Sequence, residues 1–279
     1  MNVVITGANG GLGSALLSAC ARLHPSWRAT GVIRKDADLA RPLDVVHPIL
    51  SANPDVVIHC AAMTRVDACE TEPELARAVN VEGTRAVASA AETAGARMVY
   101  ISTDYVFDGK GGAPYPVGAA PNPLNVYGKT KLEGEFLTLA EKNSLVVRTS
   151  WLYGKVGKSF PAAVLRLCQT QKEIRMVTDQ KSSPTYSEDL AAAIIKLLGK
   201  KASGIYHVSN SGSATWHEFA KAVMELKGIR GVKLTATTSD ELKAAAKRPA
   251  DSRLDCSLYS ALAGAPLRDW REALAEHLR

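Results

Sequence analysis

The sequence predicts an α/β protein in which a doubly wound parallel sheet is followed by a smaller C-terminal α/β lobe. Three observations lead to this fold class. Short apolar runs alternate with helical patterns through the first half of the chain, a glycine-rich turn joins the first run to the first helical segment, and the regular alternation ends near residue 150. Such alternation is typical of a parallel sheet that helices cover on both faces.

The first half of the chain supplies most of the predicted sheet. Strands are expected over 2–6, 28–33, 55–60, 97–102 and 144–148, and helices over 14–23, 74–93 and 125–142. In the second half, helices are expected over 158–171, 187–198, 216–227 and 269–278, and strands over 173–178 and 204–208. We therefore expect one domain over 1–150, which 187–208 rejoins, and a second domain over 151–186 and 209–279.

The composition is that of an ordinary globular protein with a mild excess of positive charge. The chain has 279 residues, of which 46% are apolar and 22% charged, and its 34 basic and 28 acidic side chains give a net charge of +6. Basic residues are dispersed and aromatic residues make up only 6%, so no nucleic-acid interface is expected. No apolar run approaches the ~18 residues of a membrane helix.

The cysteines and the amino-terminal residues indicate in which cellular compartment the protein is expected. Five cysteines are scattered along the chain without a C-x-x-C pair, which argues against a disulfide framework or a zinc site. The chain enters an apolar strand directly, without a basic leader and cleavage site. We therefore expect a cytoplasmic protein with no membrane segment.

A glycine-rich turn lies between the first strand and the first helix. It has a G-x-x-G-x-x-G spacing over residues 7–13. Glycines here allow a tight turn and let the backbone approach a pyrophosphate, whose charge favours the amino end of a helix. The sequence therefore predicts a Rossmann-type dinucleotide site. Its candidate residues in this turn are Gly7, Asn9, Gly10, Gly11, Leu12 and Gly13.

The end of the second strand bears on the choice of cofactor. A free 2′-hydroxyl usually meets an acidic residue there, whereas a 2′-phosphate favours a cation. Here Arg34 and Lys35 follow the strand, and the first carboxylate is Asp36. We expect NADPH, with Arg34 and Lys35 against its 2′-phosphate. The alternative is a solvated basic strand end and the use of NADH.

A tyrosine and a lysine four residues apart form the candidate catalytic pair. Tyr127 and Lys131 would share one face of a helix. We expect the ammonium to lower the pKa of the phenol from roughly 10, so that Tyr127 exchanges a proton near neutral pH. Ser102, Thr103 and Asp104 end a strand, and in a parallel sheet such strand ends converge on the cofactor crevice. The alternative is a chance surface pair.

These features together resemble the extended short-chain dehydrogenases/reductases and, more narrowly, the dTDP-4-dehydrorhamnose reductases. The likeness extends over essentially the whole chain. It is carried by the glycine turn, by Y-x-x-x-K, and by AAMTRVDACETEPE (61–74), STDYVFDG (102–109), PNPLNVYG (121–128), RTSWLYG (148–154), DQKSSPTY (179–186) and RPADSRLD (248–255).

The resemblance implies that NADPH reduces the C4 keto group of a dTDP-4-keto-6-deoxy-L-hexose, dTDP-4-dehydrorhamnose, to give dTDP-L-rhamnose. Tyr127 would donate the proton with the assistance of Lys131, and Thr103 would polarise the carbonyl. Contacts with the nucleotide sugar are implied for Thr103, Asp104, Trp151, Arg248 and Ser252. Cofactor contacts are implied for Asp44, Val45, Ala61, Ala62, Met63, Thr64, Ser102, Tyr127 and Lys131. The first domain would bind NADPH and the second the substrate.

The sequence departs from the family's pattern at a few positions. Met63 replaces a common Tyr or His, and Ser182 a usual Gly, so the fine substrate preference stays open. Asn80 matches a helix position that supports the site. Some members are stimulated by Mg²⁺, but no clustered carboxylates here indicate a metal site. No exposed apolar stripe decides the oligomeric state, so a homodimer stays open.

Two other functions stay open. One is another nucleotide-sugar reductase, epimerase or dehydratase of the same superfamily, although Tyr105 occupies the position of the dehydratases' glutamate base. The other is a non-catalytic, cofactor-binding regulatory subunit that resembles the methionine adenosyltransferase β subunit. For single residues we weigh Trp151 as part of the core, expect His59 and His207 to be core histidines, and expect the acidic segment 67–74 to be a solvated helix start.

Overall fold

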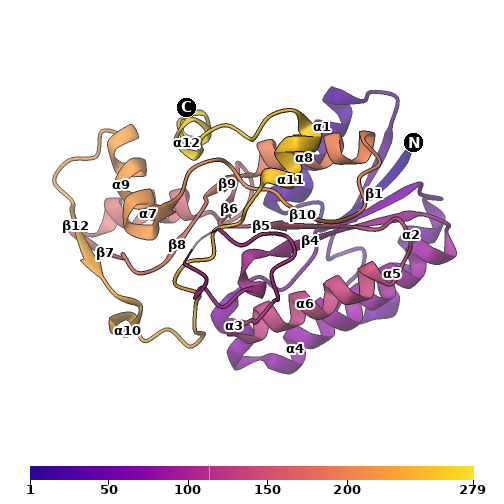
Figure 1. Cartoon of the computed structure of the whole chain (residues 1–279), viewed down its shortest axis with the longest axis horizontal. Coiled ribbons are helices and arrows are strands. Elements are labelled where there is room, and N and C mark those ends of the chain that lie inside the picture. Colours follow the sequence, from indigo (N-terminus) through magenta and orange to yellow (C-terminus); the bar gives the residue numbers. More distant parts are fainter. Residues whose placement is uncertain (113) are drawn as a thin grey trace.

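The central element is a six-stranded sheet in which all neighbouring strands are parallel (Figure 1). The computed structural model describes residues 1–112 and 114–279. In the order β10-β5-β4-β3-β1-β2, the strands are β10 (Gly204–His207), β5 (Leu145–Thr149), β4 (Arg97–Thr103), β3 (Val56–His59), β1 (Asn2–Thr6) and β2 (Arg28–Val32). The predicted α/β class with a doubly wound parallel sheet is confirmed.

The direction in which strands are added reverses at β1. From β1 the chain first adds β2 on one side and then β3 on the other. In open parallel sheets a crevice forms at such a switch point, outside the carboxyl ends of the strands, and ligands bind there. The glycine-rich turn after β1 and the segment after β3 both lie at this edge.

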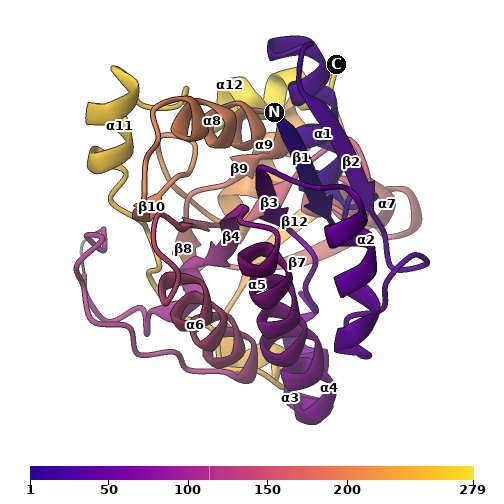
Figure 2. The same ribbon diagram turned by 90° about the vertical axis from the view of Figure 1, so that its right-hand side faces the viewer.

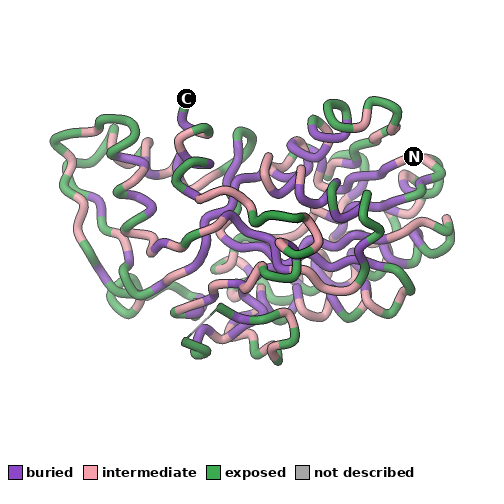
Figure 3. Tube along the Cα trace, turned by 45° about the horizontal axis from the view of Figure 1, so that its top comes forward, coloured by how far each residue is buried: buried purple, intermediate pink, exposed green. Residues whose placement is uncertain are grey.

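Helices cover both faces of the sheet (Figure 2). One face is covered by α1 (Gly11–Leu23) and α8 (Ser187–Gly199), and the other by α2 (Val46–Ser51), α5 (Gly83–Thr93) and α6 (Val126–Leu139). The shorter helices η1 (Pro42–Val45), α3 (Val66–Thr71) and η3 (Asp104–Val106) lie in the connections. Val3 and Ile5 of β1 enter the first core and Val4 the second, as the alternation of a strand requires. Figure 3 shows the buried centre that results.

The helix expected over 74–93 is interrupted, so this prediction is wrong in detail. It is divided into α4 (Pro73–Arg77), a π-helical turn η2 (Ala78–Glu82) and α5. The buried Asn80 lies in the π turn, and its side chain bonds both backbone polar groups of Met63. Single π turns inside helices are frequent at functional sites, and hydrophobic periodicity does not predict them.

A smaller lobe follows β5 and occupies the left side of Figure 1. Its elements are β6 (Leu152–Tyr153), α7 (Phe160–Thr170), β7 (Glu173–Val177), β8 (Lys181–Ser182), β9 (Thr185–Tyr186), β11 (Ala214–Thr215), α9 (Trp216–Leu226), β12 (Lys233–Thr237), α10 (Ser239–Leu242) and α12 (Trp270–His277). Its core is built around Trp270 and Phe219, which are fully buried. Of its strands only β7 was predicted, because most of the others have two residues, too few to show alternation.

Residues 187–208 return from this lobe to the main sheet. α8 packs on α1, and β10 pairs in parallel with β5, with Gly204 opposite Leu145. α11 (Ser257–Ala263) lies on the same side, where Tyr259 joins the core beneath α8. Within the described part of the chain, no helix has both the length and the apolarity needed to cross a membrane.

Two glycines let α6 approach the carboxyl end of β4 closely. A β carbon at Gly128 would lie 2.2 Å from the carbonyl oxygen of Tyr105, just beyond β4. At Gly134 it would lie 2.2 Å from the hydroxyl oxygen of Tyr100, a fully buried residue of β4. The distance between helix and sheet is therefore set by two positions without a side chain. This distance decides where α6 presents its other residues.

Replacing Gly134 by alanine is expected to destabilise the fold, although alanine is the better helix former. The gain in helix propensity is about 1 kcal/mol, whereas overpacking against Tyr100 costs about 1–3 kcal/mol. The control is Gly199→Ala at the end of α8, where no atom lies within 4 Å of the added carbon, so the free energy of unfolding should stay level or rise. Denaturant unfolding measures both. A Gly134→Ala protein more stable than the wild type would contradict the close contact.

Candidate active site

The turn after β1 has the geometry of an anion site. Gly7 has a φ of 66°, and the N–H of Gly10 donates to the carbonyl oxygen of Gly7 at 2.9 Å. A β carbon at Gly13 would lie only 2.3 Å from that same oxygen. α1 begins at Gly11 without a side-chain cap, so the positive end of the helix and its first amides are available to a phosphate. The residues present therefore fit the pyrophosphate of a dinucleotide.

Three other segments enclose this turn. A β carbon at Gly7 would lie 2.8 Å from the backbone nitrogen of Ala61, which follows β3. A β carbon at Gly11 would lie 3.2 Å from the carbonyl oxygen of Val156 and 3.5 Å from Oγ of Ser187. Ala61 belongs to a segment that was predicted to contact the cofactor. Val156 and Ser187 were not predicted, because they belong to none of the sequence motifs.

Further residues that were predicted to contact the cofactor differ in exposure. Asn9 is exposed, whereas the side chain of Leu12 is buried in the core, which leaves the backbone of Leu12 for binding. Val45 of η1 is likewise buried. Asp44 accepts a hydrogen bond from Arg41 at 2.8 Å. The segment is thus anchored by Val45, and Asp44 lies at its surface.

The two basic residues after β2 are exposed. The guanidinium of Arg34 pairs with Asp38 at 3.1 Å, and 79% of the Arg34 side chain is exposed. Lys35 is exposed as well. β2 lies beside the glycine-rich turn, because the N–H of Ala8 donates to the carbonyl oxygen of Val32 at 3.3 Å. Both cations therefore follow a strand end that adjoins the turn.

Asn80 fixes the segment after β3. Its Oδ1 accepts the N–H of Met63 at 2.8 Å, and its Nδ2 donates to the carbonyl oxygen of Met63 at 3.2 Å and to Oγ1 of Thr130 at 3.1 Å. These bonds use the backbone of Met63, so the identity of that side chain is free to differ from the family's pattern. On the same segment Ala62 is half-buried and Thr64 is exposed.

Two side chains fix the start of α6. Oδ1 of Asn125 accepts the N–H of Gly128 at 2.8 Å, and Glu70 of α3 accepts the first N–H of the helix at 2.7 Å. We expected the acidic segment around Glu70 to be solvated. That expectation holds for Glu72 and Glu74, which are exposed, and Asp67 lies in the first turn of α3. It is wrong for Glu70, which caps α6, and it did not include the pair that Asp67 forms with Arg248 at 2.7 Å. Both are long-range contacts that the charge pattern does not reveal.

Lys131 is buried on the face of α6 that meets the sheet. It is 3% exposed, and its ammonium lies 3.9 Å from the centre of the Tyr100 ring. Burial lowers the pKa of Lys131 to about 7, although the Glu135 carboxylate and then the Cys60 thiol act in the opposite direction. The ammonium is thus poised between its two protonation states near neutral pH.

The pKa of Tyr127 differs from the expectation. We expected Lys131 to lower it, but burial raises the pKa of Tyr127 well above its ordinary value. The physical reason is that the buried phenol loses the solvation of its charged form. The ammonium of Lys131 lies over the Tyr100 ring instead. Tyr127 is therefore a protonated phenol at neutral pH, which is the state of a proton donor.

Three hydroxyl groups converge on Asp104 immediately beyond β4. Oγ1 of Thr103 donates to Oδ1 of Asp104 at 3.1 Å. Ser182 and Ser252 donate to Oδ2 at 3.1 and 2.5 Å. Burial raises the pKa of Asp104 to about 6, and the three hydroxyls oppose this rise. The departure from glycine at Ser182 therefore has a structural consequence, because this fully buried side chain supplies one of the three donors.

Thr103 connects this group of hydroxyls to Tyr127. It ends β4 and caps η3, accepting the N–H of Tyr105 at 3.2 Å. Tyr127 lies next to this strand end, because the β carbon position of Gly128, the residue after it, is 2.2 Å from the carbonyl oxygen of Tyr105. The ring of Tyr105 packs edge-on against Tyr127, with centroids 5.8 Å apart. The structure therefore brings three of the predicted substrate contacts together with the predicted proton donor.

Trp151 and Arg248 come from the second half of the chain. Trp151 has a left-handed backbone, with a φ of 44°, and stacks on Trp216 with ring centroids 3.6 Å apart. A bulky side chain in this region is strained, and such strain clusters at functional sites. The guanidinium of Arg248 binds Asp67 in a bidentate pair at 3.0 and 2.7 Å. Its charge also acts on Tyr105, which packs against Tyr127, so Arg248 lies on the Tyr127 side of the site.

His59 and His207 are core histidines, as expected. Nδ1 and Nε2 of His59 lie 2.7 Å from the Thr6 hydroxyl and 3.1 Å from the Thr84 hydroxyl. Nδ1 of His207 lies 3.1 Å from the carbonyl oxygen of Tyr115. Burial lowers the pKa of each histidine to about 3, so both are neutral.

Ser102 is engaged within the protein. Its hydroxyl donates to Oε1 of Glu135 at 2.5 Å, and both residues are buried. Ser102 was predicted to contact the cofactor, and no role was predicted for Glu135. The only sequence feature that pointed to Glu135 was its position four residues after Lys131. A glutamate and a lysine at this spacing are common on exposed helices, so the feature did not distinguish Glu135.

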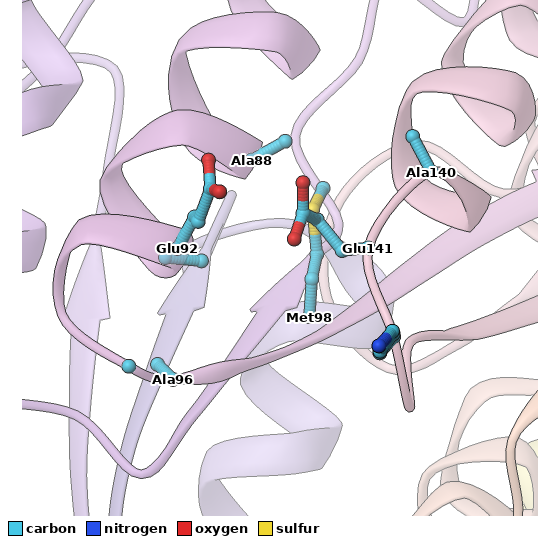
Figure 4. Close-up of a pocket in the computed structure, with 9 residues that line it drawn as sticks. Ala88, Glu92, Ala96, Met98, Ala140 and Glu141 are labelled. Atoms are coloured by element: carbon cyan, nitrogen blue, oxygen red, sulfur yellow. The ribbon is translucent and has the colours of Figure 1, made fainter.

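A cavity of about 460 Å³ lies at the opposite edge of the sheet (Figure 4). Its lining includes Ala88, Glu92, Ala96, Met98, Ala140 and Glu141. Met98 stands at the start of β4, so the cavity lies at the amino ends of the strands, away from the edge where ligands of parallel sheets bind. Among residues 1–112 and 114–279, no three His, Cys, Asp or Glu side chains are grouped to hold a metal ion.

Comparisons with known proteins agree with this geometry. The spore coat polysaccharide biosynthesis protein SpsK of Bacillus subtilis is 42% identical over 99% of this chain and 96% of its own length. A solved dTDP-4-dehydrorhamnose reductase from Clostridium acetobutylicum has a TM-score of 0.94 at 38% identity, over 100% of this chain and 98% of that one. Another solved dTDP-4-dehydrorhamnose reductase, from Bacillus anthracis and in complex with NADP, has a TM-score of 0.92 at 39% identity, over 99% of this chain and 98% of that one.

The resemblance seen in the sequence is thereby confirmed over its whole length. Every part of the chain, including the smaller lobe, is covered by relatives at a level of identity that establishes common descent. Because the model of the family described as the RmlD substrate binding domain matches residues 1–279, the chain belongs to that family.

Proposed function

We propose that this protein uses NADPH to reduce the C4 keto group of dTDP-4-dehydrorhamnose, a dTDP-4-keto-6-deoxy-L-hexose, to give dTDP-L-rhamnose. The observation that carries the proposal is that Tyr127 packs on Tyr105, whose N–H binds the Thr103 hydroxyl, at the sheet edge that also holds the glycine-rich turn. It is supported by solved relatives, 38% and 39% identical, that are dTDP-4-dehydrorhamnose reductases, one of them in complex with NADP.

Tyr127 is assigned the role of proton donor. Because burial raises its pKa, the phenol is protonated at neutral pH and has a proton to give to the C4 oxygen. Thr103 would hydrogen-bond the same oxygen, which polarises the carbonyl and stabilises the developing alkoxide. Lys131, one turn further along α6, would stabilise the phenolate that forms and bind ribose hydroxyls of the cofactor.

The cofactor side of the site follows from the elements around the switch point. NADPH, when bound, supplies the hydride for C4. The amides of the turn over 7–13 would hold its pyrophosphate, and Arg34 and Lys35 its 2′-phosphate. Residues 61–64 would lie beside the ribose and phosphates, and 44–45 beside the adenine. This assigns cofactor binding to residues 1–150 together with 187–208.

We assign substrate binding to Asp104, just beyond the end of β4, and to residues of the second half of the chain. Arg248 would bind the diphosphate of the nucleotide sugar, for which a guanidinium is well suited. Ser252 would lie near the same diphosphate, and Asp104 and Trp151 would contact the substrate. These residues include contributions from 151–186 and 209–279, which we assign to substrate binding.

Tyr105 argues against dehydration as the reaction. The 4,6-dehydratases carry a glutamate base at its position, whereas burial raises the pKa of Tyr105, so this phenol does not act as a base at neutral pH. The combination of Thr103, Tyr127 and Lys131 favours an enzyme over a regulatory subunit, because binding a cofactor without reaction requires no proton donor.

Replacing Tyr127 by phenylalanine is expected to abolish most of the turnover while NADPH still binds. Loss of a positioned proton donor lowers the rate by about 10²–10⁴-fold, whereas the turn over 7–13 is untouched. The measurement is NADPH consumption with dTDP-4-dehydrorhamnose, alongside the dissociation constant of NADPH. The matched control is Tyr206→Phe on β10, which should retain full activity.

Normal turnover by Tyr127→Phe would remove Tyr127 from the mechanism. Failure of the wild type on every nucleotide ketosugar, combined with tight binding to a protein partner, would favour the regulatory subunit instead.

Neutralising Arg34 and Lys35 together, each by alanine, is expected to weaken NADPH binding more than NADH binding. Each charge-assisted bond to a phosphate contributes about 1.5–3 kcal/mol, so the dissociation constant of NADPH should rise roughly tenfold or more. Lys221→Ala on α9 is the control for a general loss of positive charge. Fluorescence titration with both cofactors measures the difference, and equal losses for the two would discard the 2′-phosphate site.

A further inference from the structure

A buried carboxylate lies one helical turn beyond Lys131. Tyr127, Lys131 and Glu135 follow one another at intervals of four residues on α6, so they share one face of the helix. Glu135 is 1% exposed. The proposed reaction uses the first two residues and gives Glu135 no role.

Partners from two strands hold Glu135. Arg148 of β5 binds it in a bidentate pair, with Nε 2.8 Å from Oε1 and Nη2 2.6 Å from Oε2. Ser102 of β4 donates its hydroxyl to Oε1 at 2.5 Å. All three side chains are buried. Both carboxylate oxygens are thus bonded, and the side chain has one fixed position.

Stability alone does not account for this pair. The desolvation of a buried carboxylate and guanidinium offsets most of their attraction, and apolar side chains of similar volume often serve a fold as well or better. Arg148 also packs over the ring of Phe107, 5.1 Å from its centre, and its Nη1 lies 3.3 Å from Nε2 of His207. A charged pair at this place therefore indicates a role that depends on charge.

Glu135 is the negative group among the described side chains that face Lys131. His59, the last residue of β3, and Cys60, which follows it, also face Lys131. Burial lowers the pKa of His59 to about 3 and raises the pKa of Cys60 to about 12. Both side chains are therefore uncharged at neutral pH. From β4 comes the ring of Tyr100, whose pKa burial also raises. Burial favours the loss of the Lys131 proton, and Glu135 is the stronger of the groups that oppose it.

We infer that Glu135 is a positioning residue of the proposed reductase, on whose function this inference rests. Its carboxylate keeps the Lys131 ammonium charged, and through Ser102 it fixes the end of β4 that leads directly into Thr103. Arg148 in turn holds the carboxylate ionised and oriented. Glu135 acts through these neighbours and not on the reacting atoms.

The test is the pH dependence of NADPH binding by Glu135→Gln. Removing the negative charge lowers the pKa of Lys131, so Lys131 loses its proton, and with it part of its hold on the cofactor, at lower pH. We expect the midpoint at which NADPH affinity falls to move down by about one pH unit relative to the wild type. Glu133→Gln is the matched control, because Glu133 lies exposed on the same helix and pairs with Arg77 at 2.8 Å. An unmoved midpoint in Glu135→Gln, or an equal shift in the control, overturns the proposal.

A double variant separates this role from folding. Glu135→Gln leaves the Arg148 guanidinium buried without its partner, which destabilises the protein. Adding Arg148→Met removes the second charge, so the double variant should unfold at nearly the denaturant concentration of the wild type. Its NADPH midpoint should still lie below that of the wild type, because Glu135 acts more directly on Lys131 than Arg148 does. A stable double variant with the wild-type midpoint shows that Glu135 serves the fold alone.

The same measurements keep this inference separate from the reductase proposal. NADPH binding needs no sugar substrate. A wild type that binds NADPH but reduces no nucleotide ketosugar rejects the reductase, while the midpoint of Glu135→Gln still decides whether Glu135 holds the charge of Lys131.

Discussion

α6 packs against the carboxyl end of β4 without room for a β carbon at Gly128 or Gly134, and the rest of the site depends on that close contact. The contact places Tyr127 beside Thr103, and it lets Glu135 of the same helix reach the sheet. In an active site a displacement of about 1 Å can cost about 10²-fold in rate, so the spacing of helix and strand matters as much as the identity of the reacting groups. The two glycines are therefore part of the site, although neither carries any chemistry.

The features that could be predicted from the sequence are those that local chemistry decides. The spacing of glycines over 7–13 suits a tight turn before a helix, and the spacing of Tyr127 and Lys131 suits one helix face, so both were predicted from neighbours in the chain. The central strands β1, β3, β4 and β5 were predicted because a strand that is buried on both faces is largely apolar. The likeness to known reductases added the positions, such as Arg248, for which no local pattern exists.

The features that could not be predicted depend on contacts between distant segments. The π turn at Asn80 accompanies bonds from its amide to Met63, 17 residues away. The carboxylate of Asp104 gathers Ser182 and Ser252, which are 78 and 148 residues distant. Hydrophobic periodicity reports which face of an element is buried, but it carries no information about which polar groups meet inside. The same limit explains why the direction of the Tyr127 pKa was wrongly expected, since burial decides it.

Asp104 is also the point where the smaller lobe reaches the reacting groups. Ser182 lies on β8, and both it and Ser252 donate to Oδ2, whereas Thr103 donates to Oδ1. Thr103 has a single hydroxyl hydrogen, which cannot be given to Asp104 and to a substrate carbonyl at once. In the proposed reaction Thr103 must therefore turn away from the carboxylate, and a buried carboxylate that loses a donor is costly. Ser182 and Ser252 keep its other oxygen, Oδ2, bonded while Thr103 turns, so in this proposal the lobe assigned to the sugar reduces the cost of freeing the hydroxyl that acts on it.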